Sequence, residues 1–218
     1  MKRALSLDEV KRLHNLDFEQ LLNRTEPESK ARRSAENLHR CWRYFVFCFY
    51  ARGMSFVDMA HLRKDSIRGG FVRYVRKKTG QQMEMRVTSE MQSVIDSFAG
   101  EVQGALYIFP VIRDNGIPPR RQYETALRSQ NYRLKRLEAM AGIKRRISTH
   151  WARHSWASIG KQKNVPLRVI SECLGHTSEK TTRIYLDSLD NSVLDAASDT
   201  ILSAIACFPA RASSRIRL

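Results

Sequence analysis

Four polar residues near the C-terminus have side chains that can do chemistry together. His150 and Arg153 stand in THWARHSWAS, His176 in CLGHTS and Tyr185 in TTRIYLDSL. Tyrosine offers an oxygen nucleophile, arginine a permanent cation whose planar fork bonds two oxygens, and histidine a donor or proton acceptor near pH 7. Together these groups meet the requirements for attack by a side-chain hydroxyl on a phosphodiester.

Taken singly, each of these residues also has an ordinary structural explanation. His150 and Arg153 are three residues apart, so a helix places them on one face, where solvated polar pairs are common. His176 follows the helix-stopping Gly175 and could be a capping or a merely satisfied histidine. Tyr185 could be a packing residue, since a phenol with a pKa of about 10 needs nearby cations or a base in order to attack. The functional interpretation therefore depends on their combination.

Net charge is the strongest signal in the composition. The 218 residues include 38 Lys and Arg against 22 Asp and Glu, which gives +16. The cations form several separate clusters, as expected for a surface that follows a duplex backbone, although high charge also serves solubility. We expect nucleic acid to be the partner, and the candidate contacts are Arg76, Lys77, Arg120, Arg121, Arg145 and Arg146.

Several other classes of protein are disfavoured. The sequence has no run of about 18 apolar residues and no signal-peptide core, so we expect a soluble, cytoplasmic protein without membrane contact. Its cysteines, Cys41, Cys48, Cys173 and Cys207, lack metal-site or secreted-framework spacing, and the histidines do not complete a zinc pattern. We therefore expect free thiols, no metal and no cofactor.

The patterning predicts a mainly α fold with a small antiparallel β-sheet, in the α+β class. Strands at 71–75 and 83–87 flank a glycine-containing turn at 78–81, which is typical of a β-hairpin. Residues 17–29 are expected to be a polar connector. Caps and apolar spacing predict helices that begin near residue 6 and cover about 30–50, 56–62, 88–98, 120–141, 149–161, 166–174 and 192–206, with a short helix from about 178 at Tyr185.

The order of HxxRHSWAS, LGHTS and TTxxYL resembles the C-terminal signature of tyrosine recombinases, the phage integrase family. The similarity is close over this C-terminal stretch and extends more loosely back to Ser6. It implies a helical catalytic domain with a small sheet, and a site-specific recombinase that integrates or excises a mobile element.

By this resemblance, Tyr185 attacks the scissile phosphate, forms a 3′-phosphotyrosyl bond and frees a 5′-hydroxyl. The 5′-hydroxyl of a partner strand then reverses the reaction on a new end. Arg153 binds the non-bridging oxygens, His176 adds a hydrogen bond there, and His150 assists proton transfer from the tyrosine. Neither ATP nor a metal ion is required, because bond energy is conserved in the intermediate and cations replace the metal.

Two catalytic positions of the family pattern are not filled by one obvious residue in this sequence. Lys78, on the expected hairpin, is the candidate to protonate the departing 5′-oxygen, and Lys77 is its alternative. Ser55 occupies the usual position of the first family arginine. Arg52, close to one helical turn earlier, is the candidate replacement, and a structural or DNA-backbone role is its alternative. The form RGMSF.DMA.L is similar to a subgroup of integrases from mobile elements of Bacteroides-type bacteria.

The resemblance also sets expectations for domains and assembly. We expect residues 1–206 to form one catalytic domain, residues 207–218 to be a disordered basic tail, and the family's N-terminal DNA-clamping domain to be absent. A homotetramer on double-stranded DNA is implied, in which the helix at 192–206 is exchanged between protomers; without DNA the chain could be a monomer. A bacterial or phage origin follows. The alternatives are a topoisomerase-like nicking and closing enzyme and a non-catalytic DNA-binding or regulatory relative.

Overall fold

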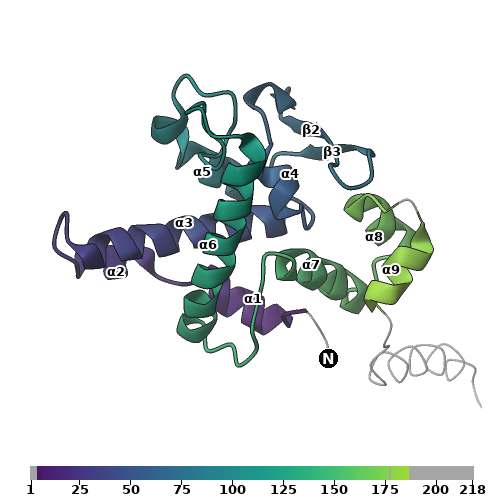
Figure 1. Ribbon diagram of the computed structural model, residues 1–218. Coiled ribbons are helices and arrows are strands. Elements are labelled where there is room, and N and C mark those ends of the chain that lie inside the picture. Colours follow the sequence, from purple (N-terminus) through teal and green to yellow (C-terminus); the bar gives the residue numbers. More distant parts are fainter. Residues whose placement is uncertain (1–3, 177, 187–218) are drawn as a thin grey trace, which may run out of the picture. The chain divides into compact units, whose positions relative to one another are not determined.

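The computed structural model describes residues 4–176 and 178–186 (Figure 1). The expected helix at 192–206 and the basic tail at 207–218 lie outside these residues. Tyr185 belongs to the last described helix by its backbone, and its side chain also lies outside the described part. No helix in the described ranges is long and apolar enough to cross a membrane.

The described chain is mainly helical and contains one three-stranded antiparallel sheet, which confirms the expected fold class. The strands are β1 (Ile67–Arg68), β2 (Phe71–Val75) and β3 (Gln82–Arg86), hydrogen-bonded in the order β1-β2-β3. The α-helices are α1 (Leu7–His14), α2 (Phe18–Asn23), α3 (Lys30–Tyr50), α4 (Phe56–Ala60), α5 (Ser89–Asp96), α6 (Pro119–Met140), α7 (Trp151–Gln162), α8 (Leu167–Leu174) and α9 (Glu179–Leu186). Short 3-10 turns, η1 (Lys64–Ser66) and η2 (Ala99–Val102), precede β1 and follow α5.

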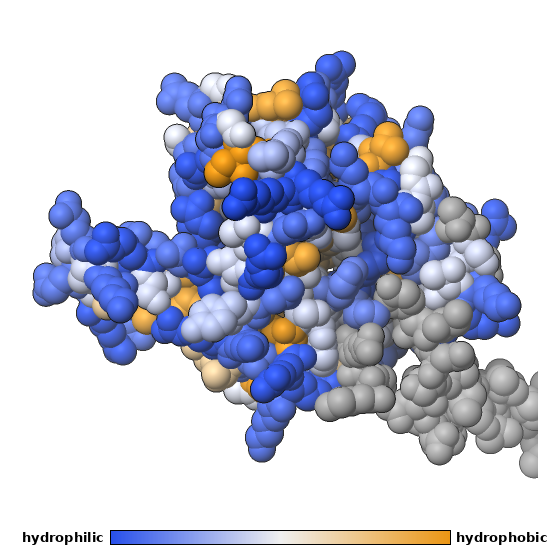
Figure 2. Space-filling view, in the orientation of Figure 1, coloured by the Kyte–Doolittle hydropathy of each residue, from blue (hydrophilic) through white to orange (hydrophobic). Residues whose placement is uncertain are grey.

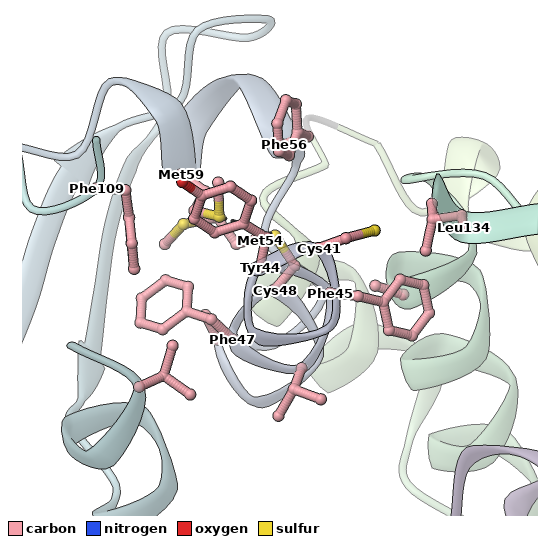
Figure 3. Packing of buried hydrophobic residues seen from close by; sticks show 14 of the residues in the cluster. Cys41, Tyr44, Phe45, Phe47, Cys48, Met54, Phe56, Met59, Phe109 and Leu134 are labelled. Atoms are coloured by element: carbon pink, nitrogen blue, oxygen red, sulfur yellow. Dashed lines mark hydrogen bonds between the residues drawn. The ribbon is translucent and has the colours of Figure 1, made fainter. Parts of the chain in front are cut away.

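Helix α3 is the central element of the hydrophobic core. The Ser29 side chain caps its first turn by accepting the Arg32 N–H at 2.9 Å, and its buried face packs against α5, α6 and α7. In Figure 3, the rings of Phe47 and Phe109 lie together, with centroids 4.7 Å apart, while Phe45 lies on the opposite side of the helix. Because α3 packs on several elements at once, it fixes α7 relative to the turn that follows Tyr50.

The polar segment 17–29 is not a simple connector, since it contains α2. Asp17 caps this helix by accepting the Gln20 N–H at 2.8 Å. Phe18 is 4% exposed and stacks on His39 of α3, with ring centroids 4.7 Å apart. The prediction was wrong for Phe18–Asn23 because one aromatic anchor stabilises a helix whose other residues are mostly polar.

The hairpin was predicted correctly in position, with one addition to its sheet. Strand β2 has the predicted bounds and β3 begins one residue earlier than expected. Val72 pairs with Met85, and both are buried against the core. Strand β1 was not anticipated, because two residues are too few to show an alternating pattern. Gly69 and Gly70, with φ of +58° and +76°, form the turn that returns it to β2.

The turn between α3 and α4 brings the backbone directly against α7. Gly53 has a φ of +70°, a conformation that residues with a Cβ rarely adopt. A Cβ at this position would also lie 2.9 Å from Cα of Arg153. Glycine is therefore required here both by the backbone conformation and by the close approach of α7.

We predict that Gly53→Ala lowers the free energy of unfolding by about 2–4 kcal/mol, because it combines backbone strain with a steric conflict at α7. The matched control is Gly69→Ala, where φ is +58° but nothing lies within 4 Å of the added Cβ, so strain alone should cost about 1–2 kcal/mol. Urea denaturation of both variants measures the difference. Equal losses would show that the approach of α7 does not contribute.

Candidate active site

Arg153 lies at a junction of three segments. It is the third residue of α7 and is 3% exposed. Its Nη1 donates to the Gly53 carbonyl at 3.0 Å, and its Nη2 donates to the carbonyl of Leu174, the last residue of α8. The guanidinium therefore connects the start of α7, the turn after α3 and the end of α8. Its position is fixed by backbone groups that are far apart in the sequence.

His150 is the residue that immediately precedes α7. The helix was expected to begin at about residue 149, but His150 is the N-cap residue and makes no side-chain capping bond. Instead, the Thr149 N–H donates to Oδ1 of Asn131 on α6 at 3.0 Å, which holds this part of the loop. Partial burial lowers the pKa of His150, and nearby Arg153, Lys78 and Arg76 lower it further. The imidazole is thus neutral at pH 7 and can accept a proton.

His176 follows the left-handed turn that ends α8. Gly175 has a φ of +61°, and the His176 N–H donates to the Ser171 carbonyl at 3.1 Å. Nδ1 of His176 lies 2.7 Å from Oγ1 of Thr182 on α9. Burial, followed by the charges of Arg153, Arg76 and Lys78, lowers the pKa of His176 to about 4. This imidazole is also neutral near pH 7, and it sits among three cations.

The β2–β3 hairpin packs against the end of α8 (Figure 1). Nη1 of Arg76 donates to the Gly175 carbonyl at 2.6 Å, and the Thr79 hydroxyl donates to the same oxygen at 3.4 Å. A Cβ on Gly175 would lie 2.6 Å from Sδ of Met83, so a side chain at this position would displace that of Met83. The hairpin and the His176 turn therefore form one unit, and exposed Lys78 projects from the same hairpin.

Arg76 departs from its expected role as a surface contact to DNA. Only 6% of it is exposed, and its guanidinium bonds the protein's own backbone beside His176. Sequence reasoning did not include it among the catalytic candidates. The one available signal was its position two residues before Lys78, which on a hairpin strand places both near the same end.

Asp58 is a second residue that sequence reasoning missed. It is 4% exposed; Oδ2 accepts the Ser55 hydroxyl at 2.6 Å, and Oδ1 accepts the Lys77 N–H at 2.8 Å. Oδ2 also lies 3.9 Å from Nε of Arg76. Ser55 itself caps α4 by accepting the Asp58 N–H. The position of the usual family arginine is therefore occupied by a capping serine that is bonded to a carboxylate anchoring the hairpin.

Arg52 does not join the group around His176. Its backbone has a φ of +54°, which is uncommon for a residue other than glycine. Its Nη1 donates to the Glu84 carbonyl on β3 at 3.3 Å. The cations that depress the pKa of both His150 and His176 are Arg153, Arg76 and Lys78. The geometry thus offers Arg76, rather than Arg52, as the second arginine of this cluster.

The remaining candidate DNA contacts differ in exposure. Lys77, Arg120, Arg121 and Arg146 are exposed, and Arg120 pairs with Glu124 at 2.9 Å. Arg145 is instead paired with Glu9 and lies over the ring of Trp151, 5.3 Å from its centroid. Arg145 thus ties the loop before α7 to α1.

Among the described residues, no cluster of three or more His, Cys, Asp or Glu could hold a metal ion.

We predict that Asp58→Asn lowers the free energy of unfolding by about 3–5 kcal/mol, because it removes the buried charge beside Arg76. Hydrogen exchange at the Lys77 amide should accelerate as the hairpin loosens. The control is Glu84→Gln, which breaks the exposed Arg73–Glu84 pair (2.6 Å) on the same hairpin and should cost less than about 1 kcal/mol. A similarly small effect for both variants would mean that Asp58 does not anchor the hairpin.

Comparison with known proteins agrees with this architecture. The model of the phage integrase family matches residues 11–192. Tyrosine recombinase XerA of Thermococcus kodakarensis is 28% identical over 153 residues, which cover 66% of this chain and 49% of that protein. The chain therefore spans about half the length of this relative.

Solved structures share the fold. The crystal structure of XerA recombinase matches with a TM-score of 0.60 and 19% identity, covering 90% of this chain and 64% of that one. XerH site-specific recombinase bound to palindromic difH substrate, in a post-cleavage complex, matches with a TM-score of 0.59 and 20% identity. The match covers 90% of this chain and 52% of that one. Because the family model matches residues 11–192, which are most of this chain, the chain belongs to the phage integrase family.

Proposed function

We propose that this chain is the catalytic part of a site-specific DNA recombinase that acts through a phosphotyrosyl intermediate. The observation that carries the proposal is the convergence of Arg76, Arg153, His150 and His176 from three separate segments. The hairpin and α7 both meet the end of α8, and α9 follows it directly with Tyr185 in its last turn. Cations and neutral imidazoles around one point are suited to an anionic transition state.

The reaction assigned to these residues is an in-line displacement at phosphorus. The Tyr185 oxygen forms a bond to the phosphorus while the bond to the 5′-oxygen breaks. His150, kept neutral by its lowered pKa, accepts the tyrosine proton, and Lys78 donates a proton to the departing oxygen. Arg153 and His176 bind the non-bridging oxygens. Attack by a new 5′-hydroxyl reverses each transfer and restores the tyrosine, so no external energy source is consumed.

Arg76 is the residue that we assign to the role of the missing family arginine. Ser55 cannot carry a charge and is already committed to capping α4 and to Asp58. The Arg76 guanidinium lies against the carbonyl that precedes His176, while that of Arg52 bonds a strand carbonyl. Nearby Asp58 orients Arg76 without fully neutralising it, because the closest separation is 3.9 Å. Lys78 remains the proton donor, since Lys77 contributes its backbone to Asp58.

Helix α6 supports double-stranded DNA as the partner. Arg128 and Lys135 are exposed and lie three residues before and four residues after Asn131, on the same side of the helix. Asn131 holds Thr149, next to His150, so this basic face adjoins the catalytic cluster. Tyr132 between them is 67% exposed. The surface over α6 is largely hydrophilic in Figure 2, as a surface that follows a phosphate backbone should be.

The wider biological assignment is also proposed. The RGMSF.DMA.L form favours an integrase of a mobile element of Bacteroides-type bacteria, acting in the cytoplasm on integration or excision. A homotetramer on DNA is the proposed working assembly, with residues 1–206 as the catalytic domain. These assignments go beyond the family membership and rest on the resemblance of the sequence.

We predict that wild-type protein forms a covalent adduct with nicked suicide duplexes, detected by denaturing gel electrophoresis. A pool with randomised sequence beside the nick avoids the need for a known target. Tyr185→Phe should form no adduct, because it lacks the nucleophilic oxygen.

Other outcomes of this experiment distinguish the competing functions. DNA binding by the wild type without any adduct would favour the non-catalytic relative. Relaxation of supercoiled DNA without strand exchange would favour a topoisomerase-like enzyme. An adduct that persists in Tyr185→Phe would move the nucleophile to another residue.

We predict that Arg76→Lys slows single-turnover cleavage by about 100-fold or more, since losing one donor to the developing charge typically has this effect. Arg52→Lys is the matched control and should stay within about threefold of wild type. Circular dichroism and DNA affinity check that both variants are folded and bind. If Arg52→Lys slowed cleavage more than Arg76→Lys, the catalytic role would be assigned to Arg52.

A further inference from the structure

A hydrogen bond joins the proposed anion-binding histidine to the helix of the proposed nucleophile. Oγ1 of Thr182 lies 2.7 Å from Nδ1 of His176, and Thr182 is fully buried. The preceding residue, Thr181, is exposed. Two adjacent threonines on α9 therefore have different environments, and only Thr182 is placed against His176.

The chemistry of this contact depends on which nitrogen carries the proton. A neutral imidazole has one N–H and one acceptor nitrogen, and the hydrogen bond made by one nitrogen selects the role of the other. The lowered pKa of His176 keeps the ring neutral. If the Thr182 hydroxyl donates to Nδ1, the N–H must be on Nε2. An N–H on Nε2 is what a phosphate oxygen needs as a partner.

We propose that Thr182 is a positioning residue that holds His176 in the Nε2–H tautomer and aims this donor at the scissile phosphate. The proposal rests on the recombinase function proposed above. Thr182 and Tyr185 are three residues apart on α9, so one helix carries both the nucleophile and the group that sets the donor. Seating α9 therefore completes two parts of the site in one step.

The backbone around His176 supports this assignment. The Gly175 carbonyl is held by Arg76 and Thr79, and the His176 N–H by Ser171. These bonds fix the main chain but leave rotation about the side-chain torsions undetermined. The bond from Thr182 supplies a constraint on the ring itself. A buried threonine that only filled space would need its methyl group and volume, not its hydroxyl.

The test separates the hydroxyl from the volume. Thr182→Val keeps the shape and removes the hydroxyl, Thr182→Ser keeps the hydroxyl, and Thr181→Val makes the same change at the exposed neighbour. The full chain is labelled with ¹⁵N, and long-range proton–nitrogen spectra of its six histidines report the tautomers. His176→Gln identifies the signal. Single-turnover cleavage of the nicked duplex pool is measured on the same proteins.

The expected result is an Nε2–H tautomer of His176 in the wild type that is lost or mixed in Thr182→Val. Cleavage by Thr182→Val should be slowed at least tenfold, since a wrong tautomer of a catalytic histidine can cost far more than that, and DNA affinity should be unchanged. Thr182→Ser should restore both readouts, and Thr181→Val should alter neither. An unchanged His176 signal in folded Thr182→Val would overturn the proposal. A wild-type N–H on Nδ1 would overturn it even if a variant failed to fold. Failure of the proposed function is distinct, since the wild type would then give no adduct while the tautomer is still observed.

Discussion

The burial of two arginine side chains around the end of α8 is the constraint on which the rest of the structure depends. Arg76 and Arg153 donate to the carbonyls of Gly175 and Leu174, and a buried cation is tolerated only when such bonds are made. Among the residues that the structure describes, Asp58 is the one acidic residue buried to a similar degree. Asp58 lies 3.9 Å from Arg76 and offsets part of this buried positive charge.

Two glycines in the left-handed conformation make this arrangement possible. Gly53 lets the turn after α3 touch the backbone of Arg153, and Gly175 lets the end of α8 touch Met83 on β3. A Cβ at Gly53 would meet the Arg153 backbone at 2.9 Å, and a Cβ at Gly175 would displace the Met83 side chain. The cations are therefore held by rigid elements instead of mobile side chains. Fixed charges of this kind stabilise a transition state without the reorganisation that water requires.

The same cations determine how the histidines can act. Their charges add to the effect of burial and lower the pKa of His150 and His176, so neither imidazole contributes positive charge near pH 7. In the proposed mechanism, arginine and lysine supply the charge, while the imidazoles supply a proton acceptor and a neutral donor. This division of roles follows from packing three cations around two histidines.

The sequence alone determined the structural features that depend on residues close together along the chain. Ser6 and Glu9 form the predicted capping box, Gly175 ends α8, and the hairpin lies where alternation placed it, because caps, turns and strand periodicity are local. The short elements α2 and β1 were missed, since Phe18 stabilises α2 through a partner on α3 and β1 exists only by pairing with β2. The family was recognised because the order of its motifs along the chain is itself distinctive.

Tertiary structure alone decided which arginine lies beside His176. Arg52 is three residues from Ser55 and was favoured by proximity in the sequence, whereas Arg76 follows β2 in the hairpin, and its position depends on how the hairpin packs against the end of α8. The same reason explains Asp58 and Arg145, whose bonds to Lys77 and Glu9 cross between elements. Sequence spacing specifies the face of a helix or strand that a side chain occupies. Only the packing of those elements specifies which side chains meet.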